Sequence, residues 1–443
     1  MYKRQQQGSA NDIAVDTDTG NFYVTGACDI TLFDMDGVES DAYIRSFTSF
    51  SDDSTTLEFE TGGLPEVMSM TGHSLARYGG ELYLVGTQTD QKGIGNIYVY
   101  SSELGITQVF ANPANESGNG IAVNSSGIYV TGTTNGLFGE FCDGVEECTI
   151  APDITHLDVV VIKLDFNLEI VWAKQFNSTA FPKGDGCLNE IGCSVAVNQD
   201  NDVYVAGAAG GQGLLLRYDE DGNRIWERRL GGADTPVAEL SANYVSFADV
   251  ATDLVSGVYV IGNTSGQIDP SVQAGTTGRS LFFARYNDIQ DIGQFEWAKQ
   301  IENEDFTSSA GYSIAVDSRN NPAQHAEIYV AGNVEFPSDS PPPTPTKNGT
   351  TSSPATICGF IDEGTFINNI SSGVQLLAGR YSQTGASFLL GDVDCNGVVN
   401  LLDIQPFVDL ITTGTFSLKA DFNEDGTVDL LDLLPFIDLI NGG

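Results

Sequence analysis

Short segments of alternating apolar and polar residues recur along most of the chain. Five of them end in Asp or Asn: residues 13–16 (IAVD), 121–124 (IAVN), 195–198 (VAVN), 250–253 (VATD) and 314–317 (IAVD). Alternation over a few residues, followed by turn residues, predicts β-strands with one buried face. The chain is therefore expected to be mainly β.

A second predicted strand follows each of these segments and carries the signature Tyr, aliphatic, any residue, Gly. It occurs at residues 23–26, 83–86, 129–132, 204–207, 259–262 and 329–332. A third strand ends in a basic residue at Lys163, Arg217, Arg285 and Arg380, and a fourth contains Trp172, Trp226 or Trp297. A repeat of four strands is the unit of a β-propeller, in which each blade buries its faces against its neighbours.

These repeats resemble the SBBP-type β-propeller family, and the third, fourth and fifth copies match best. The resemblance implies a six-bladed propeller, or part of a larger truncated one, over residues 10–390. Its repeats start near residues 12, 74, 120, 194, 248 and 313. The recurring Tyr, Trp and Gly are then expected to serve packing and turns. Propellers host many functions, so the resemblance implies no particular activity.

The extra length of the repeats falls mainly between second and third strands or between one repeat and the next. The long connections are residues 135–157, 176–192, 231–247 and 334–373. Up-and-down connectivity places both kinds of connection at the same end of a propeller, which makes that end the expected ligand surface. Within the last connection, residues 337–354 are rich in Pro, Ser and Thr and predict an exposed loop that could carry glycans.

Two copies of a calcium-loop pattern follow residue 390, namely residues 391–403 (GDVDCNGVVNLLD) and 420–432 (ADFNEDGTVDLLD). EF-hand loops place oxygen ligands at positions 1, 3, 5, 7, 9 and 12, with Gly at position 6. We therefore predict two calcium ions, held by Asp392, Asp394, Asn396, the Val398 carbonyl, Asn400 and Asp403, and by Asp421, Asn423, Asp425, the Thr427 carbonyl, Asp429 and Asp432. The acidic turns 34–37 and 219–222 lack the rest of this pattern and are expected to be solvated turns.

Each loop precedes an apolar segment at helical spacing, residues 404–411 and 433–440. The Asp at position 12 and the lack of an entering helix resemble type I dockerins over residues 391–443. This resemblance implies a small all-α domain that docks to a cohesin-like or cell-surface protein. Two departures stand out. Leucines fill positions 401–402 and 430–431, where small polar residues are usual, and Pro406 and Pro435 should delay or kink the helices.

The charge of the chain restricts its partners. Sixty acidic residues and 19 basic residues give a formal charge of −41. Such a chain repels nucleic acids and anionic lipids and attracts divalent cations. No apolar run approaches the ~20 residues of a membrane span. These features favour an extracellular or cell-surface bacterial protein.

Residues 1–5 (MYKRQ) are not a signal peptide, since they lack an apolar core. They resemble the translation of a transposon sequencing adaptor. Residues 1–9 are therefore expected to be artefactual or disordered, and the native start with its signal peptide is expected to be missing.

The seven cysteines suit an oxidising compartment. Cys142 with Cys148 and Cys187 with Cys193 each bracket a short loop, which favours local disulfides over free thiols. Cys28 and Cys358 would be neighbours if the propeller closes with six blades, and a closing disulfide is one hypothesis.

Two functions remain open at this stage. The first is a secreted, non-catalytic scaffold that binds a polysaccharide or protein and docks through its calcium module. The second is a secreted carbohydrate-active enzyme, a glycoside hydrolase or polysaccharide lyase. His73, His156 and His325 lie in different repeats, with no nucleophile motif beside them. The acidic residues are too numerous to single out a general acid and base. We favour the binding hypothesis.

Overall fold

The structure is a computed structural model. The residues it describes are 8–16, 19, 21–30, 39–48, 55–60, 67–111, 113–138, 157–176, 191–231, 244–253, 256–268, 279–288, 291–301, 308–317, 327–335, 360–368, 374–383, 404, 407–408 and 432–440.

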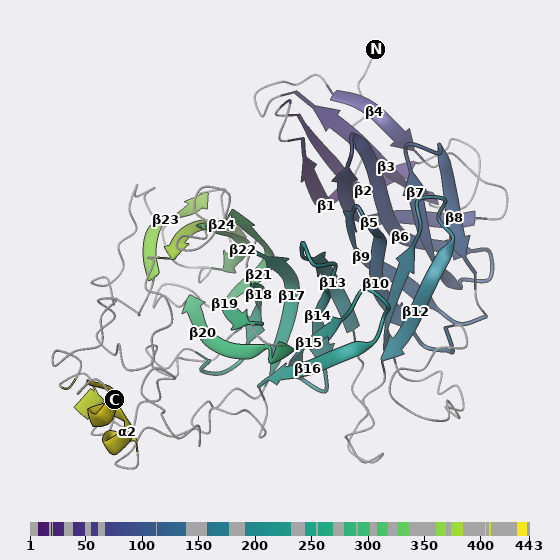
Figure 1. The fold of residues 1–443 in the computed structure, drawn as a ribbon. Helices are drawn as coiled ribbons and strands as arrows, with labels where there is room; N and C mark the ends of the chain where they lie inside the picture. Colours follow the sequence, from purple (N-terminus) through teal and green to yellow (C-terminus); the bar gives the residue numbers. More distant parts are fainter. Residues whose placement is uncertain are drawn as a thin grey trace. The chain divides into compact units, whose positions relative to one another are not determined.

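The described residues form six four-stranded antiparallel sheets (Figure 1). The first contains β1 (Gly8–Val15), β2 (Phe22–Ile30), β3 (Glu39–Phe47) and β4 (Thr55–Glu60). The second contains β5 (Val67–Tyr78), β6 (Glu81–Asp90), β7 (Gly95–Ser101) and β8 (Ile106–Phe110). The third contains β9 (Glu116–Asn124), β10 (Gly127–Thr134), β11 (Asp158–Leu164) and β12 (Ile170–Phe176).

The remaining three sheets follow in the same way along the chain. The fourth contains β13 (Ile191–Val197), β14 (Val203–Ala209), β15 (Gln212–Tyr218) and β16 (Arg224–Leu230). The fifth contains β17 (Val245–Thr252), β18 (Gly257–Thr264), β19 (Ser280–Asn287) and β20 (Gln294–Ile301). The sixth contains β21 (Ser308–Asp317), β22 (Glu327–Glu335), β23 (Phe360–Asn368) and β24 (Val374–Gln383).

In the first five sheets the strands pair in their sequence order, as in the blades of a β-propeller. The prediction of a mainly β propeller with four-stranded blades is therefore confirmed. The chain divides into two compact units, Met1–Gly210 with Leu215–Glu227 and Gly211–Leu214 with Arg228–Gly443. Strands β15 and β16 of the fourth sheet are each divided between the two units.

The sixth sheet has a different strand order, β21-β22-β24-β23. Strand β24 takes the third position, with Arg380 opposite Tyr329, as the repeat pattern predicts. The outer position is filled by β23, which precedes β24 and comes from the long connection 334–373. The sequence after residue 383 turns to the C-terminal calcium pattern, so an upstream segment completes this sheet.

Every first strand has a β-bulge opposite the glycine of the Tyr-x-x-Gly signature. Opposite Gly86, for example, the register shifts between Gly72 and Ser74, and the extra residue is His73. The same shift occurs opposite the other five signature glycines. A bulge places two residues against one and brings the backbones close together.

The close approach explains why the signature ends in glycine. A Cβ atom on Gly132 would lie 2.0 Å from the carbonyl oxygen of Ser117, and one on Gly207 would lie 1.8 Å from that of Ile191. Both distances are far below van der Waals contact, and the obstructing atoms are backbone atoms that cannot move aside. Only glycine fits at these positions.

The bulged residues of the first three sheets connect each sheet to the next. Asn11 Nδ2 donates to the carbonyl of Gly72 at 2.7 Å, and Asn119 Nδ2 donates to that of Gly192 at 2.8 Å. His73 makes the corresponding bond from Nδ1 to the carbonyl of Gly118 at 2.7 Å. In each of these sheets, the side chain of the bulged residue therefore binds a backbone carbonyl in the following sheet. That carbonyl belongs to the residue directly before the bulge of the following sheet.

The residue after the bulge adds a second link in the first and fifth sheets. Asp12 Oδ2 accepts from the hydroxyl of Ser74 at 2.8 Å and from the backbone N–H of Leu75 at 2.7 Å. Asp249 Oδ2 accepts in the same way from Ser313 at 3.0 Å and from Ile314 at 2.9 Å. Burial of Asp12 nevertheless raises the pKa of its carboxyl above the ordinary value.

Apolar clusters fill the space between successive sheets. Tyr83 and Val85 of the second sheet pack in one cluster with Ile121 and Val130 of the third. Three of the signature tyrosines, Tyr83, Tyr129 and Tyr259, are at most 1% exposed, whereas Tyr329 is 40% exposed. The expected structural role of the recurring Tyr and Gly is thus seen directly in the sheets.

The C-terminal region contains α2 (Leu433–Ile440), and the backbone is also helical at Ile404, Phe407 and Val408. Helix α2 is the one helix described as a complete element in the ranges given above. The small all-α domain therefore stays a prediction. No helix in the described part of the chain is long and apolar enough to cross a membrane.

Two fully buried tyrosines of the sheets, Tyr98 and Tyr259, give a matched test of how buried hydroxyl groups affect stability. The Tyr98 hydroxyl has no hydrogen-bond partner among the described residues, whereas the Tyr259 hydroxyl donates to Asp253 at 3.1 Å and accepts from Arg285 at 3.0 Å. Tyr98→Phe should therefore stabilise the protein by about 1 kcal/mol, because an unsatisfied buried hydroxyl is costly. Tyr259→Phe should destabilise it by about 1–2 kcal/mol. Chemical denaturation measures both, and equal effects of the two changes would contradict the interpretation.

Candidate functional site

The hairpin turns between strands are organised by Asp or Asn side chains at the strand ends. Asp219 Oδ1 accepts from the backbone N–H groups of Asp221 at 3.0 Å and Asn223 at 2.8 Å. Asp165 binds the amides of Asn167 and Glu169, each at 2.9 Å, and the Glu169 amide lowers the pKa of Asp165. The acidic turn 219–222 is thus stabilised by hydrogen bonds between the Asp219 carboxylate and the backbone of the same turn. This is the geometry expected of a solvated turn.

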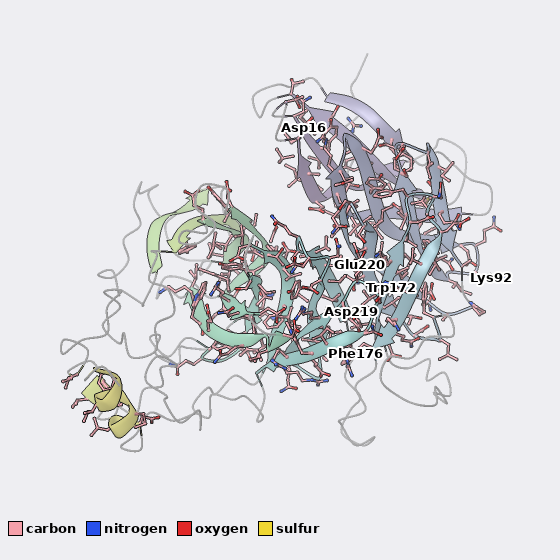
Figure 2. All side chains as sticks on the ribbon, in the orientation of Figure 1. Asp16, Lys92, Trp172, Phe176, Asp219 and Glu220 are labelled. Atoms are coloured by element: carbon pink, nitrogen blue, oxygen red, sulfur yellow. The ribbon has the colours of Figure 1, made fainter. Side chains whose placement is uncertain are left out.

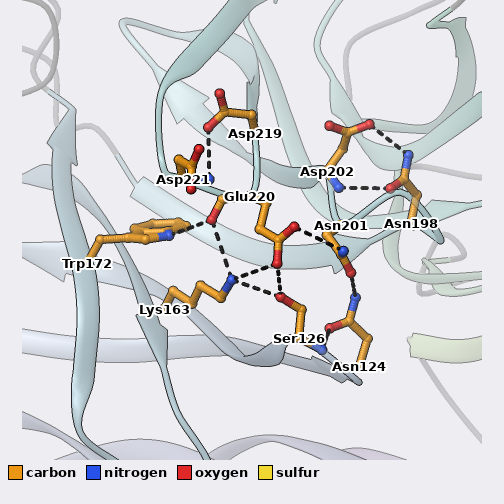
Figure 3. A network of polar contacts seen from close by, with 10 residues as sticks. All are labelled: Asn124, Ser126, Lys163, Trp172, Asn198, Asn201, Asp202, Asp219, Glu220 and Asp221. Carbon is orange, nitrogen blue, oxygen red and sulfur yellow. Dashed lines mark hydrogen bonds and ion pairs between the residues drawn. The ribbon is translucent and has the colours of Figure 1, made fainter.

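A polar network joins the turns of the third and fourth sheets (Figure 3). Figure 2 labels Trp172, Asp219 and Glu220 on the whole chain. At the centre of the network is Lys163, 5% exposed, whose Nζ lies 2.9 Å from Ser126 Oγ and 3.5 Å from Glu220 Oε1. The Ser126 hydroxyl also donates to Glu220 Oε1, and Trp172 Nε1 donates to the Glu220 carbonyl at 2.9 Å. The hydrogen bond from Ser126 and the charge of Lys163 lower the pKa of Glu220.

Two asparagines complete this network. Asn124 Nδ2 donates to Asn201 Oδ1 at 2.8 Å, and Asn201 Nδ2 donates to Glu220 Oε2 at 3.3 Å (Figure 3). The Glu220 turn of the fourth sheet is thereby fastened over the Asn124 turn of the third. Because these polar groups satisfy one another, the network is best explained as a structural link between the two sheets. We call this network of Asn124, Ser126, Lys163, Asn201 and Glu220 the polar clasp.

The basic residue at the end of the third strand has a structural role in the third, fourth and fifth sheets that the sequence did not reveal. Arg217 pairs with Asp202 at 2.9 Å, and Arg285 pairs with Asp253 at 3.7 Å and with Glu296. Lys163 lies directly opposite the signature residue Tyr129 on the neighbouring strand, with its Nζ 5.4 Å from the ring centroid. A cation over an aromatic face is stabilising, and more so when it is desolvated. The recurrence of a basic residue at this place of the repeat was the available sequence signal, and it did not identify the acidic partners.

Of the three histidines considered for catalysis, the described residues contain His73. Its ring is held in the bulge by Gly118, and burial lowers its pKa. His156 and His325 lie outside the described residues. His73 therefore serves the junction between the second and third sheets.

Most of the predicted calcium ligands also lie outside the described residues: Asp392, Asp394, Asn396, Val398, Asn400, Asp403, Asp421, Asn423, Asp425, Thr427 and Asp429. The twelfth, Asp432, is fully buried and directly precedes α2. Its carbonyl accepts the first hydrogen bond of the helix, from the Phe436 N–H at 3.1 Å. Asp is among the preferred residues at this capping position.

The expectation that Pro435 would delay or kink the helix is wrong. Helix α2 begins at Leu433, so Pro435 is its third residue. The N–H groups of the first turn have no acceptor within the helix, and a proline there removes no hydrogen bond. The corresponding prediction for Pro406 falls outside the described residues.

The two repeats of the C-terminal pattern meet through their aromatic residues. Phe407 and Phe436 occupy equivalent places in the two apolar segments, 29 residues apart (436−407). Both are fully buried, and their rings stack with centroids 4.4 Å apart. The duplication in the sequence thus corresponds to a packed pair.

Other predicted features cannot be placed. The long connections proposed as the ligand surface lie largely outside the described residues, as do the turn 34–37 and Cys142, Cys148, Cys187 and Cys358. Cys193 lies in β13, and Cys28 lies in β2. The disulfides therefore stay predictions. In the described part of the chain, no group of three or more His, Cys, Asp or Glu side chains is arranged to hold a metal ion.

No family model matches the chain, and no curated protein matches it. Solved structures similar to it include prolyl oligopeptidase B from Galerina marginata, with 13% identity, a TM-score of 0.33 and coverage of 72% of this chain. The chain covers 38% of that enzyme. A GH43_1 enzyme from Xanthomonas citri has 13% identity and a TM-score of 0.34, with 66% of this chain and 91% of the enzyme covered. Likeness this low carries no argument about function.

The buried His73 predicts a specific dependence of stability on pH. A folded-state pKa below the unfolded value means that the unfolded chain binds more protons. The free energy of unfolding should then fall as the pH drops below about 6.5. His73→Asn, which places the residue found at Asn11 and Asn119, should keep the bond to Gly118 and remove this part of the acid sensitivity.

Thermal unfolding of both proteins at pH 8 and pH 5 tests this expectation. Relative to the original protein, the His73→Asn variant should be more stable at pH 5 than it is at pH 8. An equal difference at the two pH values would contradict the assignment.

Proposed function

We propose that this is an extracellular calcium-binding protein. A β-propeller serves as a binding scaffold for a polysaccharide or protein, and a C-terminal module binds two calcium ions and docks to a cohesin-like or cell-surface partner. The observation that carries the proposal is the pair of calcium-loop sequences 29 residues apart (421−392).

The C-terminal geometry supports this proposal in two ways. Asp432, at position 12 of the second loop, is fully buried, and its backbone carbonyl accepts the first hydrogen bond of α2, so a ligand position is coupled to the start of a helix. Its oxygen donors and those of the other predicted ligands suit a hard cation such as Ca²⁺. The Phe407–Phe436 contact supports a pairing of the two repeats.

Two further features favour docking and an extracellular location. Ile404, Val408 and Ile437 are 38–39% exposed on helical backbone, which leaves aliphatic side chains available to a partner. The formal charge of −41 favours solubility in salt and attraction of divalent cations.

Calorimetric titration of the full chain with CaCl₂ tests the metal proposal. Two ions should bind with roughly micromolar affinity, which is typical of sensor-like EF-hand loops. The double change Asp392→Ala with Asp421→Ala should abolish both, because it removes the first ligand of each loop. Asp219→Ala with Asp221→Ala is the matched control in an acidic turn and should still bind two ions.

A second variant separates capping from metal binding. Asp432→Asn keeps a good helix cap but offers a neutral ligand, so it should weaken one of the two sites about tenfold and leave the other unchanged. Retention of both ions by the Asp392/Asp421 variant would refute the assigned loops.

A further inference from the structure

Two aromatic side chains meet on the turns at the junction of the second and third sheets. Tyr78 ends β5, and Phe166 lies in the turn after β11. Their rings are nearly parallel at 18°, with centroids 6.0 Å apart. Tyr78 is 38% exposed, whereas Phe166 is half-buried. The ring centroid of Phe166 also lies 6.3 Å from that of the buried Tyr83. An aromatic surface is thus open to solvent at this junction.

The repeats of the chain show that the fold does not require aromatic residues there. The place of Tyr78 is taken in the other repeats by Asp16, Asn124, Asn198, Asp253 and Asp317. The place of Phe166, directly after the turn aspartate, is taken in the fourth sheet by Glu220. At the junction of the third and fourth sheets these positions form the polar clasp described above. The two aromatic replacements are separate in sequence and meet in space.

Carboxylates lie on the two turns that carry this pair and on the turn 101–105. The Tyr83 hydroxyl donates to Glu103, and the charges of Glu103 and Glu81 add to burial in raising the pKa of Tyr83. Asp165 and Glu169 begin and end the turn that carries Phe166. The three turns, residues 78–81, 101–105 and 165–169, contain no Lys or Arg. These three turns therefore carry a net negative charge.

Two glycines follow Tyr78. Gly79 and Gly80 have φ angles of 61° and 97°, a conformation that suits a tight turn of two glycines. Apart from its chain neighbours, a Cβ atom on either glycine would meet no atom of the described residues within 4 Å. The turn next to Tyr78 therefore carries no side chain that could cover its ring.

The face of an aromatic ring is electron-rich and attracts cations. Nearby carboxylates add to this attraction and repel anions. A small inorganic ion keeps its tightly held water, whereas an alkylated ammonium group is poorly hydrated and can pack against a ring. We propose that Tyr78 and Phe166, with Glu81 and Glu103, form a binding site for an organic cation of the quaternary ammonium class. The site is separate from the calcium module and does not depend on its function.

Ligand-observed NMR on the calcium-saturated full chain, with choline as the probe, tests this site. The neutral isostere 3,3-dimethylbutan-1-ol is the matched ligand, since it has the same shape and no charge. Choline should bind about fivefold more tightly than the isostere, a ratio expected for a partly exposed cation over a ring. Equal binding of the two ligands would overturn the proposal.

Two sets of variants locate the binding. Tyr78→Asn with Phe166→Glu introduces the residue types of the neighbouring clasp, so the protein should fold and lose choline binding. Tyr312→Asn removes another exposed tyrosine, 56% exposed on β21, and should leave binding intact. Glu81→Gln with Glu103→Gln should weaken choline several-fold without changing binding of the isostere, which decides the matter even if the aromatic variant fails to fold. Unchanged choline binding in the glutamine variant would contradict the site.

Discussion

The β-bulge opposite each signature glycine is the constraint on which the rest of the sheet structure depends. It brings the backbone of the first strand so close to the second that a Cβ atom on Gly132 would meet the Ser117 carbonyl at 2.0 Å. It also turns one side chain out of the alternating pattern toward the next sheet, where Asn119 reaches Gly192. A single local irregularity therefore fixes the register within a sheet and provides the link to its neighbour.

The sequence predicted the four-stranded repeats well, because alternation and a recurring glycine are local signals. It did not predict the side-chain links between sheets. The partners of Asn11, His73 and Asp12 lie some 45–63 residues away, and no local pattern records them. The role of the buried Lys163 was missed for the same reason, since its partner Glu220 lies 57 residues away in the sequence. The order of the sixth sheet was also missed, since β23 lies in a connection without the repeat signature.

The candidate sites differ in how much the sequence could reveal. Calcium ligands in an EF-hand loop come from one short segment, so spacing alone names all twelve positions. Asp432 shows why such a loop can influence structure beyond itself, because this residue directly precedes α2 and its carbonyl accepts the first hydrogen bond of the helix. The aromatic pair of Tyr78 and Phe166 joins two turns that are distant in sequence, and it became visible when the structure placed the rings 6.0 Å apart.

The most direct test of the bulge as the organising constraint is the stability of Gly132→Ala relative to Gly105→Ala, measured by chemical denaturation. Gly105 has a φ of 63° with open space around it, so alanine there should cost only about 1 kcal/mol through backbone strain. Alanine at Gly132 must push two paired strands apart and should cost roughly 4 kcal/mol or more. Similar small losses for the two variants would contradict the account.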